Sequence, residues 1–417
     1  MGELVGLIDC NNFFVSCERL FRPDLQNKPV LVLSSNDGCV VARSQEVKDM
    51  SIPMGVPHFQ IKDIIKDKGI AVFSGNLTLY RDISRRVFAV VAESFAKLEQ
   101  YSIDEAFVIL SDVTDLQQLI AQVKDNVFTQ TGMPVSIGVA SSKTLAKYAV
   151  DQAKQTTGCY VLTQDEWLRS AATVPLPTLW GVGRRLAEQY KTAGLFTAAD
   201  LMQADQSRVA QLFGVQGTRL QAELAGEYVH LVTSKRPLQK SLMSSRSFAT
   251  KTENKAILSD ALAYHARHIA AQLRSMDAVA GTIRVSLQTS RHGDFLLRGG
   301  SLVTVLTEPT ADTFTLISQA AQLLESLYEP AVPYQKVGVM VGEITNRLSL
   351  TTSLFPKPQT DNAALLQTID ALNKTVSGRE LIVFGSRLQT KQWQSKAVAR
   401  SAAYTTRWSD IARVSAS

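Results

Sequence analysis

Two acidic residues stand side by side in the segment YSIDEAF, residues 101–107, whose other side chains are largely apolar. The pattern predicts a buried strand or its end, where a carboxylate needs a partner because burial removes its hydration. A third acid, Asp9, follows another apolar run, residues 4–8. We expect Asp9, Asp104 and Glu105 to meet at neighbouring strand ends.

Three carboxylates brought together repel one another unless cations lie among them. Mg²⁺ prefers such hard oxygen ligands, and two ions about 3.5–4 Å apart stabilise both the attacking and the leaving oxygen of a phosphoryl displacement. Taken singly, each acid is better explained as a turn or salt-bridge residue. Taken together, the three favour phosphoryl transfer with two Mg²⁺ ions.

Residues suited to a triphosphate occur at two other places in the first half of the chain. Arg43, Gln45 and Lys48 cluster at the head of a short predicted helix. Lys147 and Lys154 lie two turns apart on another predicted helix and therefore share a face. Lys154 also has a simpler explanation, because cations are favoured at the C-terminal end of a helix.

The segment LWGVGRRLAEQYKTAGLFTAADL predicts a contact with a nucleic-acid backbone. Glycines allow a close approach, and the N–H groups that begin a helix attract phosphate. A short helix, a turn and a second helix make the helix–hairpin–helix pattern, which binds backbone without reading sequence. The candidate contacts are Gly181, Gly183, Arg184 and Arg185. A later FGVQG, residues 213–217, is interpreted as an ordinary helix turn, with a degenerate copy of the same glycine turn as the alternative.

Alternating strands and helices must position these residues, and the patterns predict an α+β chain of several domains. Residues 1–30 and 71–165 mix strands and helices around one sheet, and a hairpin-bearing domain is inserted at 31–70. Short helices follow at 166–235. Residues 241–346 have the order β-α-β-β-α-β, with both helices on one side of a four-stranded sheet. A linker is predicted at 347–361 and a tail with one amphipathic helix at 362–417.

Arg246 and Arg284 fall on predicted strands of the β-α-β-β-α-β region. Arg284 lies between Ile283 and Val285 and should therefore face away from the helices. An open cationic sheet face suits a duplex backbone, although a merely solvated face is the alternative.

Composition and charge agree with a catalytic unit followed by one that binds a polyanion. The 417 residues are 45% hydrophobic and 20% charged, ordinary values for a soluble protein of three or four domains. Residues 1–200 hold 20 Lys and Arg against 22 Asp and Glu, and residues 201–417 hold 24 against 16. No apolar stretch has the length of a membrane span, so we expect a cytoplasmic protein with its four cysteines reduced.

The chain resembles the Y-family translesion DNA polymerases over nearly its whole length. It is most similar to the UmuC-type catalytic subunits of DNA polymerase V, chromosomal or plasmid-borne. The resemblance is carried by LIDCNNFFVSCERLF, LSSNDGCVVARSQEVK, YSIDEAF, SIGVASSKTLAKYAVDQAK, LWGVGRRL, SSRSF and YTTRWSDIARV. It implies a right-hand fold with a palm at 1–30 and 71–165, fingers at 31–70, a helical thumb at 166–235 and a little finger at 241–346.

The resemblance also implies roles for individual residues. Asp9, Asp104 and Glu105 would bind the metals, together with the carbonyl of Cys10. Phe13 and Phe14 would contact the dNTP, with Phe14 at the steric gate that excludes a ribose 2′-OH. The triphosphate would meet Arg43, Gln45, Lys48 and Lys154. Many relatives have Tyr at the gate, and several have Tyr at the position of Gln45.

Partners follow from the same resemblance. It implies primed template DNA, dNTPs, a processed UmuD-like dimer and RecA. Leu354 and Phe355, in the segment TTSLF, resemble the sliding-clamp peptide of such polymerases, although Thr351 stands where a Gln is usual. The activity implied is error-prone synthesis across damage, in SOS mutagenesis, without proofreading.

Two other functions stay open at this point. A nucleotide cyclase also uses such a palm and two metals, but it does not need LWGVGRR or a basic second half. A non-catalytic DNA-binding subunit with a vestigial palm is the other, and the presence of all three acids argues against it.

Overall fold

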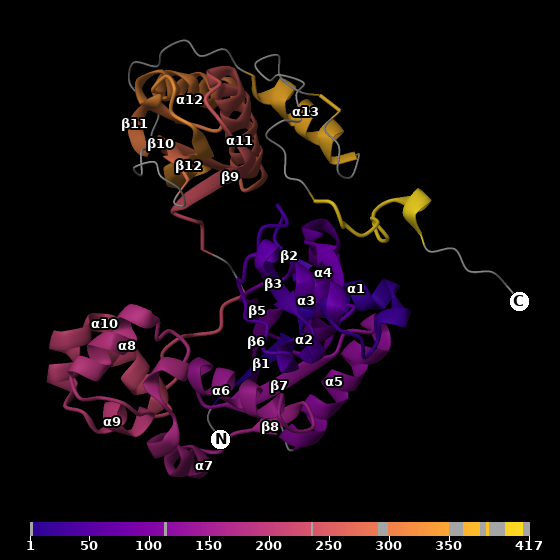
Figure 1. Ribbon diagram of the computed structural model, residues 1–417. Coiled ribbons are helices and arrows are strands. Elements are labelled where there is room, and N and C mark those ends of the chain that lie inside the picture. The colour runs from indigo at the N-terminus through magenta and orange to yellow at the C-terminus, as the bar shows by residue number, and fades with distance from the viewer. Residues whose placement is uncertain are drawn as a thin grey trace, which may run out of the picture. The chain divides into compact units, whose positions relative to one another are not determined.

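The computed structural model describes residues 3–111, 115–234, 237–290, 299–349, 362–375, 381–382 and 397–411 (Figure 1). The chain forms two compact units. Unit 1 comprises residues 1–236 and 398–417, and unit 2 comprises residues 237–397. The C-terminal end of the chain therefore belongs to the same unit as its N-terminal half.

A five-stranded sheet forms the centre of unit 1, in the order β5-β6-β1-β7-β8. The middle strand, β1, pairs antiparallel with both of its neighbours, β6 and β7. The strands are β1 (Leu4–Cys10), β5 (Leu98–Gln100), β6 (Glu105–Leu110), β7 (Val135–Ala140) and β8 (Cys159–Val161). Buried apolar residues fill β1 and β7 because helices cover both faces of the sheet.

Alternate residues of β1 pack into two different hydrophobic cores, one on each face of the sheet. Ile8 and Cys10 pack under α1 (Phe13–Phe21), α4 (Leu77–Ser94) and α5 (Leu116–Thr131). Val5 and Leu7 pack under α6 (Lys143–Ala153) and α7 (Gln164–Ser170). Asp9 has the parity of Val5 and Leu7, so its side chain lies on the α6 face.

A separate three-stranded sheet, β3-β2-β4, has its own apolar core and extends beyond the predicted fingers at 31–70, because it includes residues 30 and 71–74. The expected hairpin is confirmed, because β2 (Val30–Leu33) and β3 (Val40–Arg43) pair antiparallel across a turn that holds Asp37 at φ 53°. The third strand, β4 (Ala71–Ser74), runs parallel to β2. The helices here are α2 (Gln45–Asp49), η2 (His58–Gln60) and α3 (Lys62–Asp67), whereas η1 (Pro23–Leu25) precedes β2 and packs against the central core.

Residues 164–224 are mostly helical, as the sequence predicts, but residues 225–234 of the predicted helical region form no helix. The elements are α7, η3 (Ala171–Thr173), η4 (Leu176–Thr178), α8 (Arg184–Thr192), α9 (Ala198–Gln203) and α10 (Gln206–Leu224). The interpretation of FGVQG as an ordinary helix turn is wrong. Gly214 has φ 62° and ψ −158°, a conformation suited to glycine, and it divides α10 into two helical halves.

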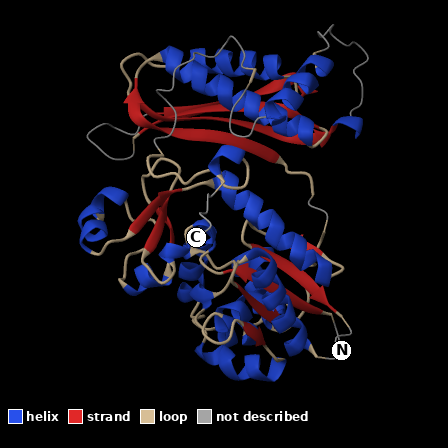
Figure 2. Cartoon of the chain, turned by 90° about the vertical axis from the view of Figure 1, so that its right-hand side faces the viewer, coloured by secondary structure: helices blue, strands red, loops and turns tan. Residues whose placement is uncertain are grey.

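Unit 2 has the predicted order β-α-β-β-α-β, and its strands are arranged β11-β10-β12-β9. Its helices cover one face of the sheet (Figure 2). The elements are β9 (Ser241–Thr252), α11 (Lys255–Ser275), β10 (Ala278–Thr289), β11 (Gly299–Thr310), α12 (Thr313–Leu327), β12 (Tyr334–Asn346) and η5 (Arg347–Ser349). The predicted tail helix is α13 (Ala363–Thr375).

The chain then returns to unit 1. Residues 397–411, here called the C-terminal segment, contain one short helix, η6 (Trp408–Asp410), and Arg400 forms a parallel bridge with Ser74 of β4. Within the described residues, no helix is both long enough and apolar enough to cross a membrane.

Candidate active site

Asp9 and Glu105 lie directly opposite each other on the paired strands β1 and β6. Opposed residues of an antiparallel pair share one face, with their Cβ atoms about 4.5–5.5 Å apart. Asp9 is 9% exposed, and Glu105 is partly buried. The sequence prediction that these two acids meet at strand ends is therefore confirmed by the strand register.

Asp104 precedes β6 and is tied to β1 through its backbone. Its carbonyl oxygen accepts a hydrogen bond of 2.9 Å from the amide of Cys10. Its carboxylate accepts a hydrogen bond from the hydroxyl of Ser102. Cys10 is buried, and burial, with the nearby carboxylate of Asp9, raises the pKa of its thiol. The thiol is therefore neutral, and the group of Cys10 that could bind a hard metal ion is its backbone carbonyl oxygen.

Three lysines of α6 and its C-cap pair with acids from three adjacent strands. Lys143 Nζ lies 2.8 Å from Glu99 of β5, and Lys147 Nζ lies 2.6 Å from Glu105 of β6. Lys154 Nζ lies 2.9 Å from Asp9 of β1. The order of the acids, β5-β6-β1, is the order of the strands in the sheet. None of the three pairs was predicted from the sequence, which placed Lys147 and Lys154 on one helix face as residues for a triphosphate.

Burial raises the pKa of Asp9 to about 7, and the neighbouring Glu105 adds to this rise. The ammonium of Lys154 acts in the opposite direction. Charged carboxylates at this depth require positive charge beside them. In the structure, the ammonium groups of Lys147 and Lys154 supply this positive charge to Glu105 and Asp9.

The predicted basic residues of the fingers lie close to this cluster. Burial, then the charges of Arg43 and Lys154, lower the pKa of Lys48, and Asp9 acts in the opposite direction. Arg43 donates a hydrogen bond to the backbone carbonyl of Ile52. Lys48, Arg43 and Lys154 therefore form one cationic patch beside Asp9. Gln45 is exposed, and its amide bonds Asp49 on its own helix at 2.8 Å.

Phe14 is half-buried in the first turn of α1, four residues beyond Cys10. Its ring stacks on Tyr80 of α4, with centroids 4.6 Å apart and an interplanar angle of 18°. Phe13 lies in the hydrophobic core and is 3% exposed. The ring of Phe13 is therefore too buried to make the expected contact with a nucleotide, whereas part of the ring of Phe14 stays exposed.

The donor set suits a hard divalent cation. Two carboxylates face each other, and a third lies next to one of them in sequence. Over the part of the chain that the structure describes, no three His, Cys, Asp or Glu side chains gather closely enough to form a preformed metal cluster. The lysine ammonium groups already lie where these carboxylates need positive charge. The residues fit a metal centre whose carboxylates pair with lysines in this structure.

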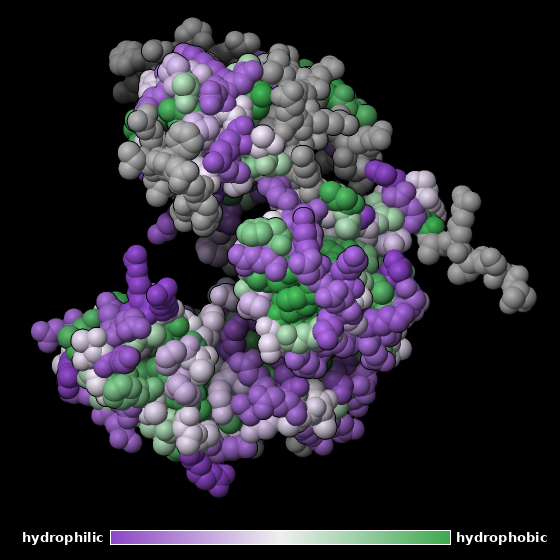
Figure 3. Space-filling model, in the orientation of Figure 1, coloured by the Kyte–Doolittle hydropathy of each residue, from purple (hydrophilic) through white to green (hydrophobic). Residues whose placement is uncertain are grey.

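The helix–hairpin–helix segment has the predicted turn. Gly181 has φ 87°, which an L side chain rarely adopts, and a Cβ at Gly181 or Gly183 would meet no atom within 4 Å. Gly183 caps α8, and Arg184 and Arg185 are exposed in its first turn. The element before the turn is the 3₁₀ helix η4. Hydrophilic side chains cover much of the face of this region in Figure 3.

The sheet of unit 2 separates the two predicted arginines. Arg284 is exposed, and its neighbours on β10 are buried, so it faces away from the helices as expected. Arg246 is half-buried and has the parity of Ser244, whose hydroxyl bonds His265 of α11 at 2.7 Å. Because side chains alternate along a strand, Arg246 lies on the helix-covered face and not on the open one. Leu354 and Phe355 lie outside the described residues.

The direct cross-strand neighbours of Arg284 are Met340 of β12 and Val303 of β11, and small side chains lie further along the same face. Cross-strand neighbours on this face include Gly338 beside Ser245 and Ser286, and Lys336 beside Ser247. Arg284 and Lys336 place two cations on this face, and phosphate groups attract such charges.

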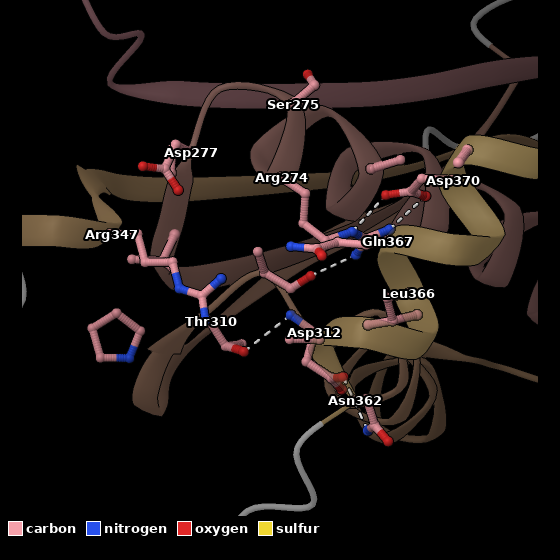
Figure 4. Close-up of a pocket in the computed structure, with 17 residues that line it drawn as sticks. Arg274, Ser275, Asp277, Thr310, Asp312, Arg347, Asn362, Leu366, Gln367 and Asp370 are labelled. Carbon is pink, nitrogen blue, oxygen red and sulfur yellow. Dashed lines mark hydrogen bonds and ion pairs between the residues drawn. The ribbon is translucent and has the colours of Figure 1, made fainter. Parts of the chain in front are cut away.

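A cavity of about 560 Å³ in unit 2 is not part of the acidic site (Figure 4). It lies between the end of α11, the end of β11 and α13. Arg274 of α11 forms a two-bond ion pair with Asp370 of α13, at 2.7 and 2.8 Å, and also bonds the carbonyl of Ala311. These bonds attach α13 to the domain.

The fold matches a solved Y-family DNA polymerase chimera of Dbh and Dpo4 with a TM-score of 0.67, over 82% of this chain and 99% of that one, at 18% identity. The impB/mucB/samB family matches residues 8–151, its C-terminal domain matches 239–354, and a domain of unknown function matches 363–414.

Relatives match along the whole chain. Protein ImpB of Salmonella typhimurium is 34% identical over 98% of this chain and 99% of its own length. Protein UmuC of Salmonella typhimurium is also 34% identical, over 99% of this chain and 100% of its own. DNA polymerase IV 1 of Halalkalibacterium halodurans is 28% identical over 63% of this chain and 64% of its own.

The fold is that of the Y-family DNA polymerases. Within that class, the chain belongs to the impB/mucB/samB family, the UmuC type of translesion DNA polymerase. It is accordingly a DNA-directed DNA polymerase, and membership implies DNA and dNTP substrates and the use of divalent metal ions.

Proposed function

We propose that this chain extends a primer across damaged template DNA by nucleotidyl transfer at Asp9, Asp104 and Glu105. These residues, with the carbonyl of Cys10, would hold two Mg²⁺ ions. The observation that carries the proposal is the register of β1 and β6, which sets Asp9 opposite Glu105 next to a patch of cations. Bound divalent ions would stabilise the charge that develops on the attacking and leaving oxygens.

The chain's own side chains would position the incoming nucleotide. Arg43, Lys48 and Lys154 gather beside Asp9 and would present positive charge to a triphosphate, and Gln45, on the same short helix as Lys48, would be a further contact. On binding, the triphosphate would draw Lys154 from Asp9 and free that carboxylate. Phe14, held against Tyr80, would close the pocket on the ribose side and exclude a 2′-OH.

DNA would be held outside this pocket by two surfaces that do not read sequence. The first is the turn at Gly181 and Gly183 with Arg184 and Arg185 at the start of α8. The second is the open sheet face around Arg284 in unit 2. Contacts with phosphates release counterions, so affinity should fall steeply with salt.

The palm, fingers, thumb and little finger would span 1–30 with 71–165, 31–70, 166–235 and 241–346. The biological setting would be SOS mutagenesis, in which synthesis is error-prone and lacks proofreading. The partners would be a processed UmuD-like dimer, RecA and a sliding clamp that meets Leu354 and Phe355. A nucleotide cyclase is less well supported, because it has no use for the DNA-binding turn. Extension of a primed template, as opposed to a cyclic product from free nucleotide, distinguishes the two.

The test is primer extension by the purified chain across an abasic template, with and without a UmuD-like dimer and RecA. Asp104→Asn should abolish extension, because one metal-binding carboxylate is lost, while binding of primed DNA is retained. Asp125→Asn, on the exposed surface of α5, is the matched control and should extend normally. Synthesis by Asp104→Asn at the rate of the unaltered chain would refute the assignment of the site.

A further inference from the structure

The C-terminal segment is anchored on unit 1 by a row of hydrogen bonds. The amide of Ser74 donates to the carbonyl of Ala399 at 3.0 Å, and the amide of Ala399 donates to the hydroxyl of Ser74 at 3.0 Å. Asn76, the N-cap of α4, donates to the hydroxyl of Ser401 at 3.0 Å. Ser74 and Asn76 are 0% and 2% exposed, so these bonds are made in the interior.

Ser401 also reaches a buried carboxylate on another element. Its hydroxyl donates to Glu18 Oε1 of α1 at 3.0 Å. The same oxygen accepts a hydrogen bond of 2.6 Å from the hydroxyl of Tyr80. Glu18 is 0% exposed, and within the described residues its other oxygen, Oε2, has no hydrogen-bond partner. Glu18 therefore depends on these two donors.

Tyr80 connects this carboxylate to the wall of the nucleotide pocket. Its hydroxyl is held by Glu18, and its ring stacks on Phe14. Tyr80 is 0% exposed, so its ring has little room to move except together with its neighbours. A second aromatic contact, between Tyr404 and Phe21 with centroids 4.5 Å apart, fixes the segment at the other end of α1.

We propose that the C-terminal segment positions the steric gate, through Ser401, Glu18 and Tyr80 to Phe14. The segment lies within the part of the chain that matches a domain of unknown function, residues 363–414. Ser401, Glu18 and Tyr80 are positioning residues, since none of them is placed at the reacting atoms. The inference rests on the proposed role of Phe14 as the gate, and it adds that selection against ribonucleotides depends on residues almost four hundred positions away.

The test compares kcat/KM for a dNTP with that for the matching rNTP in the full-length chain. Ser401→Ala removes the donor to Glu18, and Ser401→Thr keeps it. Tyr80→Phe removes the other donor but keeps the ring that stacks on Phe14. Ser409→Ala is the matched control, because its hydroxyl lies in the same segment and bonds the adjacent Asp410.

Ser401→Ala should lower the dNTP preference roughly fivefold, the effect of about one hydrogen bond. Tyr80→Phe should act in the same direction, and the double variant should lose less than the two single losses combined, since both act through Glu18. Ser401→Thr and Ser409→Ala should keep the preference of the unaltered chain. Hydrogen exchange at the amides of Leu79 and Tyr80 should quicken in Ser401→Ala but not in Ser409→Ala, which provides a readout independent of synthesis.

An unchanged dNTP preference in Ser401→Ala would overturn the inference, as would equal effects of Ser401→Ala and Ser409→Ala. Unchanged exchange at the start of α4 in Ser401→Ala would overturn it too, even in a variant too weak to assay. Failure of the proposed function gives a different result. If Phe14→Ala itself leaves the preference unaltered, Phe14 is not the gate.

Discussion

The ring of Phe14 supports a prediction about discrimination between dNTPs and rNTPs. It stands at the start of α1 with one face on Tyr80 and part of its surface exposed. Phe14→Ala removes the wall, so incorporation of rNTPs relative to dNTPs should rise by about tenfold or more, which a loss of about 1.4 kcal/mol of discrimination produces. Primer extension with each nucleotide alone measures this.

The control for that prediction is Phe128→Ala, which removes a ring that is 58% exposed on α5. Its selectivity should not change. Equal use of rNTPs before and after Phe14→Ala would remove Phe14 from the gate.

For single residues, the sequence predicts which acids form the site, but it does not predict the buried residues that support it. Asp9 and the pair at 104–105 stand out because each follows or begins an apolar run, and runs of this kind become adjacent strands. Glu18 does not stand out, since on an amphipathic helix an acid is normally exposed. Its burial depends on Tyr80 and Ser401, which are 62 and 383 residues away, and no local pattern indicates such partners.

At the scale of an element, the start of α8 supports a prediction about DNA affinity. Arg184 and Arg185 are exposed beside a turn whose glycines leave room for a backbone. Each phosphate contact contributes about one to the slope of log affinity against log salt. Arg184→Ala with Arg185→Ala should weaken binding to all DNA sequences alike and reduce that slope by about two.

Fluorescence anisotropy of primed DNA between low and high salt measures both quantities. Arg169→Ala, an exposed arginine of α7, is the matched control and should leave the slope as it is. A double variant with an undiminished slope would mean that α8 makes no phosphate contact.

The pair of His265 on α11 and Ser244 on β9 supports a prediction about stability. Burial, then the charges of Arg246 and His268, lower the pKa of His265 to about 3. The unfolded chain binds a proton near pH 6.5 and the folded one does not, so stability is full above pH 6.5 and falls as the pH drops towards 3. The loss is up to about 1.4 kcal/mol per pH unit.

The pH dependence of the unfolding transition of unit 2, followed by calorimetry, checks this. His265→Asn keeps a hydrogen-bonding group near Ser244 but does not titrate, so the fall in stability below pH 6.5 should be smaller. His58→Asn, in unit 1, should leave the transition of unit 2 unchanged. A fall of the same size in His265→Asn would show that other groups cause it.

Elements themselves were largely predictable because their signals are local. The order β-α-β-β-α-β of unit 2, the hairpin around Asp37 and the amphipathic α13 all follow from periodicity and turn residues. Gly214 was misjudged because a glycine within a helical pattern is often tolerated, and only the backbone angles show that the helix breaks there. Arg246 was expected at the DNA surface, but it alternates in phase with the apolar Leu242 and Phe248, which indicates the helix-covered face.

In the whole molecule, two connections of the chain link unit 1 and unit 2. It passes from unit 1 to unit 2 near residue 237 and returns near residue 398. The sequence gives no sign of the return, because the partners of the C-terminal segment, Ser74, Asn76 and Glu18, are more than three hundred residues away. Arg274 and Asp370 attach α13 to unit 2, so the part of the chain that matches the domain of unknown function has an anchor in each unit.

This arrangement predicts that a C-terminal truncation weakens the N-terminal unit. Deleting residues 398–417 leaves the buried Glu18 without one donor and opens the side chains of Ser74 and Asn76 to water. Leaving one buried charged group under-satisfied costs about 2 kcal/mol, which corresponds to a fall of roughly 5 °C in Tm for a unit of this size. The transition of unit 2 should not move, since α13 and its ion pair remain.

Calorimetry of the truncated chain, with hydrogen exchange to assign each transition to its unit, measures the effect. A shorter deletion, of residues 412–417, is the control and should leave both transitions in place. A drop in the transition of unit 2 alone would show that the segment stabilises the little finger instead. Unchanged melting of unit 1 would mean that the hydrogen bonds of Ser74, Asn76 and Ser401 contribute nothing net, because water replaces the segment without loss.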